Sequence, residues 1–175
     1  LSMGGQLSRS EIHVACEESG AHTNLNGVYI ARDSQHIDNT TLIDHLVPNT
    51  TSKETYKGAL DDKARGVFQG MIVVAEGADG TDGQMSNKTL LLSDESEIDS
   101  KPQLEIYADD VKCAHGFATG ELEETSLFYL RSRGIPEVTA RAMLVEGFLA
   151  EVVEEGIKED YQEIFKAKIS AWMEN

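Results

Sequence analysis

Two side chains able to bind a metal ion lie close together in the second half of the chain. Cys113 and His115 are separated by one residue and follow a segment in which apolar and polar residues alternate, which predicts a β-strand. Side chains two residues apart on a strand share a face, roughly 6.5–7 Å apart along it. A thiolate and an imidazole on one face suit iron, zinc or an iron–sulfur cluster. The alternative is a small buried thiol and a turn histidine. The spacing alone favours that alternative, because a single C-x-H is not a metal signature.

Other polar groups are weaker candidates for chemistry. His36, Asp38, Asp44 and His45 form a dense group that could bind a metal, although Asp and His at strand corners usually serve as hydrogen-bonding residues. The pairs at 61–62 and 109–110 are adjacent aspartates, which point to opposite faces of a strand and so make no acid/base dyad; we expect them in solvated turns. The sequence contains no G-x-S-x-G, P-loop, G-x-G-x-x-G or H-E-x-x-H motif.

Charge and composition exclude several classes of function. The 175 residues include 31 acidic and 15 basic side chains, a net charge of −16, whereas nucleic acids and anionic membranes require clustered Lys and Arg. No apolar run approaches the roughly 20 residues of a membrane span, and the first residues do not resemble a signal peptide. Cys16 and Cys113 are too few for a disulfide framework, which predicts a cytoplasmic protein. Because strand-like sequence begins almost at once, we expect a fragment or a truncated chain.

Up to about residue 120, the chain consists of short alternating runs separated by turn residues, a pattern typical of many short strands. The predicted strands are 11–18, 22–30, 35–47, 64–77, 88–98 and 103–113. A sandwich, a barrel and a β-solenoid all fit this pattern, and Asn- and Asp-rich corners such as 38–39 and 86–87 favour the solenoid. The polar, glycine-rich stretch 77–87 is predicted to be a flexible loop.

After residue 120 the apolar period becomes helical, so we divide the chain into a β-rich core, 1–120, and a helical domain, 121–175. A short helix is predicted over 124–133, closed by Gly134, with Pro136 in the first turn of the next helix. The second helix carries an apolar stripe and a third begins near residue 160. The two stripes are Val138, Ala142, Val145, Leu149 and Val152, and Tyr161, Ile164, Phe165, Ile169 and Trp172. Packing within the molecule is the more common use of such stripes, and binding a partner is the alternative.

Three long segments resemble the SufB/SufD family of iron–sulfur cluster assembly scaffold proteins, and within it the C-terminal half of the SufD branch. They are QHIDNTTLIDHLVPNTTSKETYKGALDDKARGVFQGMIVV (35–74), SNKTLLLSDESEIDSKPQLEIYADDVKCAHGFATGEL (86–122) and LFYLRSRGIPE (127–137). The resemblance implies a mainly β fold, a right-handed parallel β-helix truncated at its N-terminal side and followed by a small C-terminal α-helical domain. The chain departs from the family pattern because it lacks the N-terminal half.

The resemblance also implies a function and partners. It implies a non-catalytic scaffold subunit that pairs with a SufB-like subunit and docks the SufC ATPase, with no stably bound cofactor but a transient iron or iron–sulfur cluster shared with the partner. The family's interface residues match Cys113 and His115, with His115 the firmer candidate. The helical region that contacts SufC maps onto Leu127, Phe128, Leu130, Arg131 and Arg133. Cys16 matches no family role.

Two functions of other classes remain open. The first is a structural module that forms a homodimer through the edges of its β-helix, without a metal role. The second is a β-helix enzyme acting on carbohydrate, which needs carboxylates and aromatic platforms in a cleft. One Trp, five Tyr and five Phe, with Trp172 in the tail, make the enzyme the least favoured hypothesis.

Overall fold

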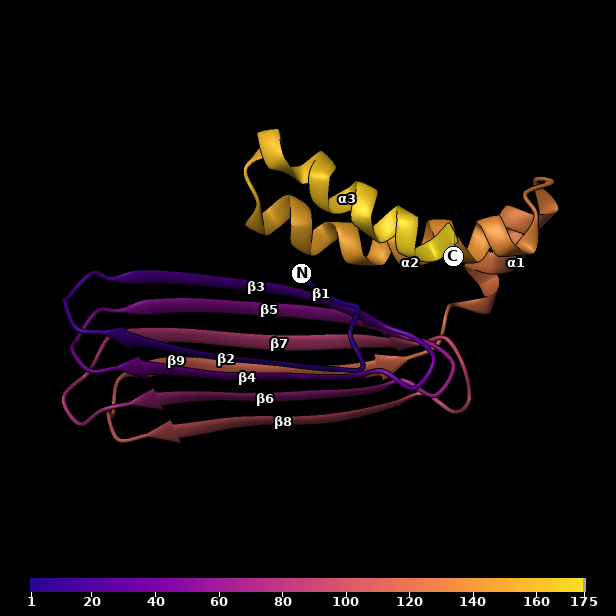
Figure 1. The fold of residues 1–175 in the computed structure, drawn as a ribbon. Coiled ribbons are helices and arrows are strands. Elements are labelled where there is room, and N and C mark those ends of the chain that lie inside the picture. Colours follow the sequence, from indigo (N-terminus) through magenta and orange to yellow (C-terminus); the bar gives the residue numbers. More distant parts are fainter. Residues whose placement is uncertain (175) are drawn as a thin grey trace.

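In a computed structural model, which describes residues 1–174, the chain forms a parallel β-helix of about four turns followed by three helices (Figure 1). This confirms the predicted mainly β class and β-helix architecture. The strands are β1 (Ser2–Met3), β2 (Leu7–Cys16), β3 (His22–Ala31), β4 (His36–His45), β5 (Thr51–Leu60), β6 (Arg65–Val74), β7 (Thr81–Leu91), β8 (Glu97–Ile106) and β9 (Val111–Gly120).

The strands alternate between two parallel sheets. Odd-numbered strands form one sheet in the order β1-β3-β5-β7-β9, and even-numbered strands form the other in the order β2-β4-β6-β8. Leu7 pairs with His36, and Arg65 pairs with Glu97, so one coil of the solenoid takes roughly 30 residues. Consecutive coils therefore place residues about 30 positions apart side by side. Strands β1 and β2 form one end of the solenoid, and β8 and β9 form the other (Figure 1).

Alternate side chains of each strand fill the space between the two sheets, as the pleat of a strand requires. The interior cluster is built on Tyr29, Phe68 and Ile72, which are fully buried, and the rings of Tyr56 and Phe68 lie 5.1 Å apart. The corners turn at residues with positive φ, among them Asp33, at 54°. Asn and Asp tolerate this left-handed conformation better than most residues.

Polar side chains also occupy the interior. Tyr29 donates a hydrogen bond of 2.9 Å to Asn87, and His45 is fully buried with its ring nitrogens 2.7 Å from the Thr50 hydroxyl and 2.9 Å from the Ser52 hydroxyl. Burial lowers the pKa of His45, because desolvation disfavours the imidazolium. These polar side chains thus find partners either nearby in the chain or in a coil as far as two turns away.

Three helices follow the last strand: α1 (Glu124–Ser132), α2 (Glu137–Gly156) and α3 (Glu159–Glu174). Gly134 ends α1 with φ 85° and donates its amide to the Arg131 carbonyl, as the sequence predicts. Pro136 is the N-cap of α2, one residue before the first turn in which the sequence places it. Helix α2 lies across the outer face of β3 and β5, with α3 packed on it (Figure 1). No helix among residues 1–174 is long and apolar enough to cross a membrane.

The helices and the outer face of the odd-numbered sheet enclose a second core, so the predicted intramolecular use of the two stripes is confirmed in part. From the second helix Val145, Leu149 and Val152 are buried, and from the third Ile169 and Trp172 are buried. Three other members of the predicted stripes are exposed: Val138, Tyr161 and Ile164. The stripes are therefore narrower than the sequence period indicates, because each helix contacts the molecule along only part of its length.

Five local predictions are wrong. The sequence-based assignment leaves out β5 and treats 77–87 as a loop, whereas β7 begins at Thr81. Stacking between coils supplies backbone hydrogen bonds to both strands, so neither needs a strongly apolar pattern. The predicted strand 88–98 is the end of β7, a corner, and the start of β8. The predicted strand 103–113 is the end of β8, a corner, and the start of β9. The predicted corners at 38–39 and 86–87 lie inside β4 and β7.

Candidate functional site at the open end of the β-helix

Cys113 and His115 lie on β9, the last strand of the odd-numbered sheet. Cys113 is paired in register with Gly83 of β7, and His115 is paired with Met85. Because side chains alternate along a strand, Cys113, His115 and Phe117 share the face that is turned inward, above the preceding coil. No further strand of the described chain covers them from the other side. Both predicted ligands therefore lie at the open end of the solenoid.

The Cys113 thiol is half-buried and packs against the interior cluster. Gly83 leaves room for it, since a Cβ at Gly83 would lie 3.4 Å from Sγ of Cys113. Burial raises the pKa of Cys113, and the nearby Asp82 carboxylate raises it further, while the Gly83 backbone counteracts part of the effect. The thiol is therefore held in its protonated form unless a cation at the site displaces the proton.

The His115 ring is exposed, and among the described residues it makes no hydrogen bond or ion pair. Both ring nitrogens are thus accessible to a ligand from outside the chain. This distinguishes His115 from the buried His45, whose two nitrogens are both within hydrogen-bond distance of hydroxyls. His115 is therefore the more accessible of these two histidines.

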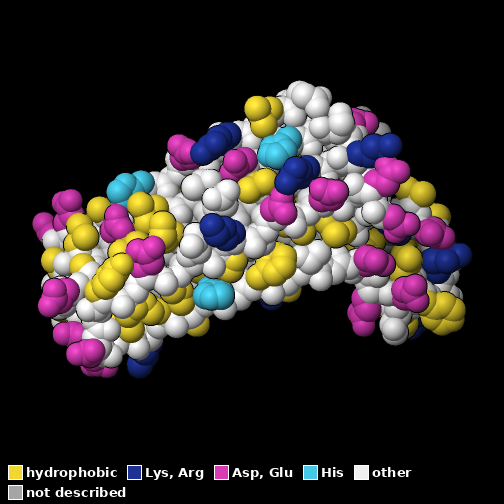
Figure 2. Space-filling model, turned by 90° about the horizontal axis from the view of Figure 1, so that it is seen from below, with side chains coloured by type: hydrophobic (Ala, Val, Ile, Leu, Met, Phe, Trp, Pro, Cys, Tyr) yellow, Lys and Arg dark blue, Asp and Glu magenta, His cyan; other side chains and the backbone are white. Residues whose placement is uncertain are grey.

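Apolar side chains surround this end. Ile106 and Tyr107, at and just after the end of β8, and Phe117 on β9 are exposed, with Phe117 at 45% of its full area. The terminal strands β8 and β9 also leave one row of backbone N–H and C=O groups without a neighbouring strand in the described chain, which is a template for pairing with another chain. In Figure 2, hydrophobic side chains gather in groups between Asp and Glu side chains along the visible face of the molecule.

The other sequence-predicted metal candidates do not come together. His45 points into the core, whereas Asp44 points outward, where its carboxylate lies 2.6 Å from Nε2 of His13. Nowhere in residues 1–174 do three or more His, Cys, Asp or Glu side chains form a group that could hold a metal ion. The Asp61–Asp62 and Asp109–Asp110 pairs lie in turns, where we expect them.

The residues predicted to bind a partner through the helices lie on or next to α1. Phe128 is 73% exposed, whereas Leu127 and Leu130 are half-buried against the rest of the molecule. Arg131 forms an ion pair of 3.3 Å with Glu137 at the start of α2. Arg133 follows the helix and places its guanidinium 5.4 Å from the centre of the Tyr129 ring. Phe128 and Tyr129 together form the exposed apolar part of α1.

Comparison with known proteins assigns the chain to a family. Residues 1–148 match the family model described as "SUF system FeS cluster assembly, SufBD core domain". The chain belongs to the SufB/SufD family. It is 38% identical over 161 residues to the iron-sulfur cluster assembly protein SufD of Escherichia coli, covering 90% of this chain and 38% of the relative. It is 30% identical over 154 residues to SufD of Bacillus subtilis, covering 86% of this chain and 35% of that protein.

A plant relative extends the family further. The chloroplastic protein ABCI7 of Arabidopsis thaliana is 35% identical over 157 residues, covering 88% of this chain and 33% of the plant protein. The chain thus spans roughly two fifths or less of the length of these curated relatives. Membership of the SufB/SufD family and the SufD names of its relatives confirm the resemblance and support a role in iron–sulfur cluster assembly.

The sequence indicates Cys113 and His115 as candidate ligands, which stays a prediction, but it does not indicate what surrounds them. The exposed apolar residues Ile106, Tyr107 and Phe117 become a rim only because β8 and β9 are the last strands of their sheets. A cleft lined by lysines on β5 and β7 was also missed, because β5 was not assigned as a strand. The alternation of Lys53, Thr55 and Lys57 along that segment is the signal that could have indicated a strand with one polar face.

Proposed function

We propose that this chain is a non-catalytic scaffold subunit that supports iron–sulfur cluster assembly by pairing with a SufB-like subunit. The observation that carries the proposal is the open end of the solenoid. There an exposed imidazole and a half-buried thiol share one face beside unpaired strand edges and an apolar rim. A partner that continues the solenoid or packs on its end would bury this rim and meet both ligands.

The nascent cluster is cargo in this proposal, held only in the complex. One thiolate and one imidazole leave a tetrahedral iron site incomplete, so the partner or sulfide supplies the other ligands. Iron reaching Cys113 would have to displace the proton from a half-buried thiol whose pKa is raised, whereas the exposed His115 ring has no partner in the described chain to displace. His115 is therefore the primary ligand in this chain and Cys113 the secondary one.

The SufC ATPase docks on the helices in the same proposal. The exposed pair Phe128 and Tyr129 on α1 offers apolar surface at a distance from the solenoid end, and Arg131 and Arg133 add positive charge beside it. This arrangement separates the ATPase contact from the cluster-bearing end. The chain itself, in the proposal, neither hydrolyses ATP nor cleaves polysaccharide, because its sequence has no phosphate-cradling P-loop and its paired aspartates lie in turns.

One experiment tests the proposal in the complex of the full-length protein with SufB-like and SufC subunits. We expect His115→Ala to lower the yield of assembled cluster by roughly tenfold or more, the range seen when residues around metal sites are removed. Cys113→Ser should have a smaller effect. His13→Ala, on the outer face of β2, is the matched control and should leave the yield unchanged. Phe128→Asp should abolish co-purification of SufC while leaving the circular dichroism of the β-helix intact.

The outcomes separate the parts of the proposal. Wild-type cluster yield with His115→Ala would remove the ligand role and leave a structural partner of the SufB-like subunit. Undiminished SufC binding with Phe128→Asp would remove α1 from the docking role. Failure of the wild-type protein to co-purify with the SufB-like subunit, together with a homodimer in solution, would replace the scaffold by a dimerisation module.

A further inference from the structure

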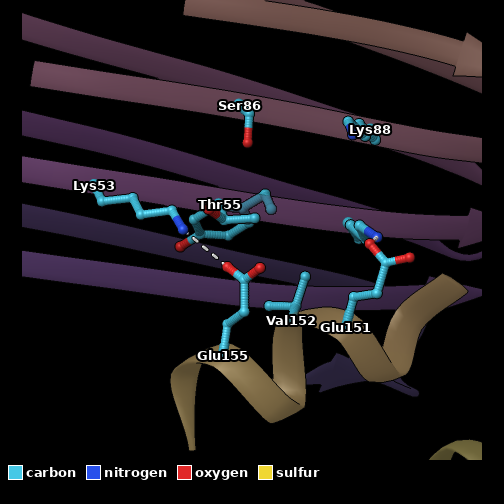
Figure 3. Close-up of a pocket in the computed structure, with 9 residues that line it drawn as sticks. Lys53, Thr55, Ser86, Lys88, Glu151, Val152 and Glu155 are labelled. Carbon is cyan, nitrogen blue, oxygen red and sulfur yellow. Dashed lines mark hydrogen bonds and ion pairs between the residues drawn. The ribbon is translucent and has the colours of Figure 1, made fainter.

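A small cleft lies between the outer face of the odd-numbered sheet and helix α2, well away from the solenoid end. Its volume is about 170 Å³, space for a small ion and a few waters at roughly 30 Å³ per water. One wall is formed by residues of β5 and β7, and the other by α2 (Figure 3). The charged or hydroxyl-bearing residues whose side chains face this cleft are Lys53, Thr55, Lys57, Ser86, Lys88, Glu151 and Glu155.

The strand register concentrates positive charge in this cleft. Lys57 of β5 is paired with Lys88 of β7, and their side chains share the outward face of adjacent parallel strands about 4.8 Å apart. Like charges directly opposite each other on a sheet are destabilising. Lys53 adds a third ammonium group two alternations earlier on β5 (Figure 3). The protein as a whole carries a net charge of −16, so three lysines lining one cleft form a local exception.

The two glutamates of α2 compensate only part of this charge. Lys57, whose side chain is 5% exposed, donates to the Phe148 carbonyl at 2.9 Å and pairs with Glu151. Lys53 pairs with Glu155 at 2.9 Å. Lys88 makes no ion pair within the described residues, although it contributes to the lowered pKa of Glu155 together with Lys53. One ammonium in the cleft therefore has no carboxylate of its own.

Neutral donors complete the arrangement. Thr55 and Ser86 are paired in register in the row next to Lys57 and Lys88, so their hydroxyls face outward into the same cleft. In Figure 3, Ser86 lies on the same strand as Lys88, and its hydroxyl points towards the neighbouring strand that carries Thr55 and Lys53. Convergent ammonium and hydroxyl donors are the groups that bind a tetrahedral oxyanion, because each of its oxygens accepts hydrogen bonds and its charge makes them stronger.

We propose that this cleft binds a small inorganic oxyanion of the phosphate class between Lys53 and Lys88, with hydrogen bonds from Thr55 and Ser86. Glu155 is the internal competitor: its side chain is 55% exposed, so it can leave Lys53 and turn to solvent when the anion enters. Lys57 remains with α2 through Glu151 and the Phe148 carbonyl. Anion binding thus exchanges one of the two ion pairs that join α2 to the sheet.

Titration of the protein with inorganic phosphate, followed by amide NMR shifts and calorimetry, tests the proposal. We expect saturable binding in the range of roughly 0.1–10 mM, with shifts centred on β5, β7 and the second half of α2. Lys88→Gln should weaken binding by about tenfold or more, the loss expected for one charge-assisted contact. Lys63→Gln, which removes an equal charge from the exposed corner before β6, is the matched control and should leave binding unchanged.

A second variant tests the competition. Glu155→Gln removes the carboxylate that occupies Lys53 and should tighten phosphate binding severalfold. Absence of saturable binding, or equal weakening by Lys88→Gln and Lys63→Gln, would overturn the proposal by reducing the effect to general charge screening. Both lysines are exposed, so unchanged thermal melting of these variants is expected and excludes unfolding as the cause. The cluster-yield assay on His115→Ala is independent of these outcomes.

Discussion

Strands β5 and β9 have the same length and lie in the same sheet, yet they have opposite environments. On β5 the inward Glu54 and Tyr56 are buried between the sheets, and the outward Lys57 and Ala59 are buried beneath α2. On β9 only Val111 and Cys113 are half-buried, and every residue from Ala114 to the end of the strand is exposed. One β-solenoid thus contains a strand closed on both faces and a strand left open.

The difference separates stability from binding. A closed coil buries its side chains against neighbours above, below and outside, which stabilises the fold and shifts the pKa values of titratable groups inside. The last coil has neighbours on one side only, so its inward side chains stay accessible. Ligands for an external metal or partner can therefore lie on β9 at little cost to the fold.

We expect the largest difference in stability between two aromatic-to-alanine variants, one inside the solenoid and one on β9. Phe68 on β6 is fully buried against Tyr56, so Phe68→Ala should lower the free energy of unfolding by about 3–5 kcal/mol. Phe117→Ala on β9 should cost about 1 kcal/mol or less, because Phe117 is 45% exposed. Urea unfolding of the two variants measures the contrast, and equal losses would mean that the end coil is as well packed as the middle.

Glu54 provides the second test, through pH. Both carboxylate oxygens are buried without a hydrogen-bond partner in the described residues, and burial raises the pKa of Glu54 from 4.5 to about 7, slightly offset by Thr41. The folded-state pKa exceeds the unfolded one. The stability contributed by the neutral carboxyl is therefore fully present below about pH 4.5 and is lost as the pH rises through about 7.

Glu54→Gln keeps the shape and removes the titration. At pH 8 we expect the free energy of unfolding of the variant, measured with urea, to exceed that of the wild type by up to about 3 kcal/mol. Near pH 4.5 the two free energies should be equal. Glu97→Gln, the same substitution at the exposed start of β8, is the matched control for the change of side chain. A flat difference between wild type and Glu54→Gln from pH 4.5 to 8 would contradict the buried, neutral state of this carboxyl.

Glycines sharpen the comparison further. A Cβ at Gly58 on β5 would overlap the buried ring of Tyr29, whose hydroxyl is bonded to Asn87 and Thr89 and cannot move away freely. Gly58→Ala should therefore cost about 1–3 kcal/mol, as overpacking does. At Gly116 on β9 a Cβ has nothing within 4 Å, so Gly116→Ala should change stability by no more than about 0.5 kcal/mol. Thermal melting distinguishes them, and a Gly116→Ala loss as large as that of Gly58→Ala would indicate a covered end.

The sequence predicted the β-helix and the helices better than it predicted individual strands. Helices were found because their apolar period and their caps at Gly134 and Pro136 are local signals. The pattern of β7 predicts a loop because its inward positions include Gly83 and Asn87, which are small or polar. Gly83 faces Cys113, 30 positions away, and Asn87 accepts a hydrogen bond from Tyr29, 58 positions away. Such contacts are invisible to a window of ten residues.

The sequence likewise predicts part of the candidate site. That Cys113 and His115 share a face follows from their spacing and is correct. Their accessibility is a different matter, because it depends on β9 being the last strand of its sheet, which no local pattern reports. The lysine cleft joins Lys53 to Glu155, residues about a hundred positions apart, and only the folded chain brings them together.

The register of the solenoid has a mechanical consequence. Helix α2 rests on β3 and β5, and β9 lies two ladder steps from β5, roughly 10 Å away at about 4.8 Å per step. Every step between them is a full parallel ladder of ten paired residues. Because both steps are hydrogen-bonded along the whole strand, we expect α2, the sheet and β9 to move as one body when a partner binds at either place.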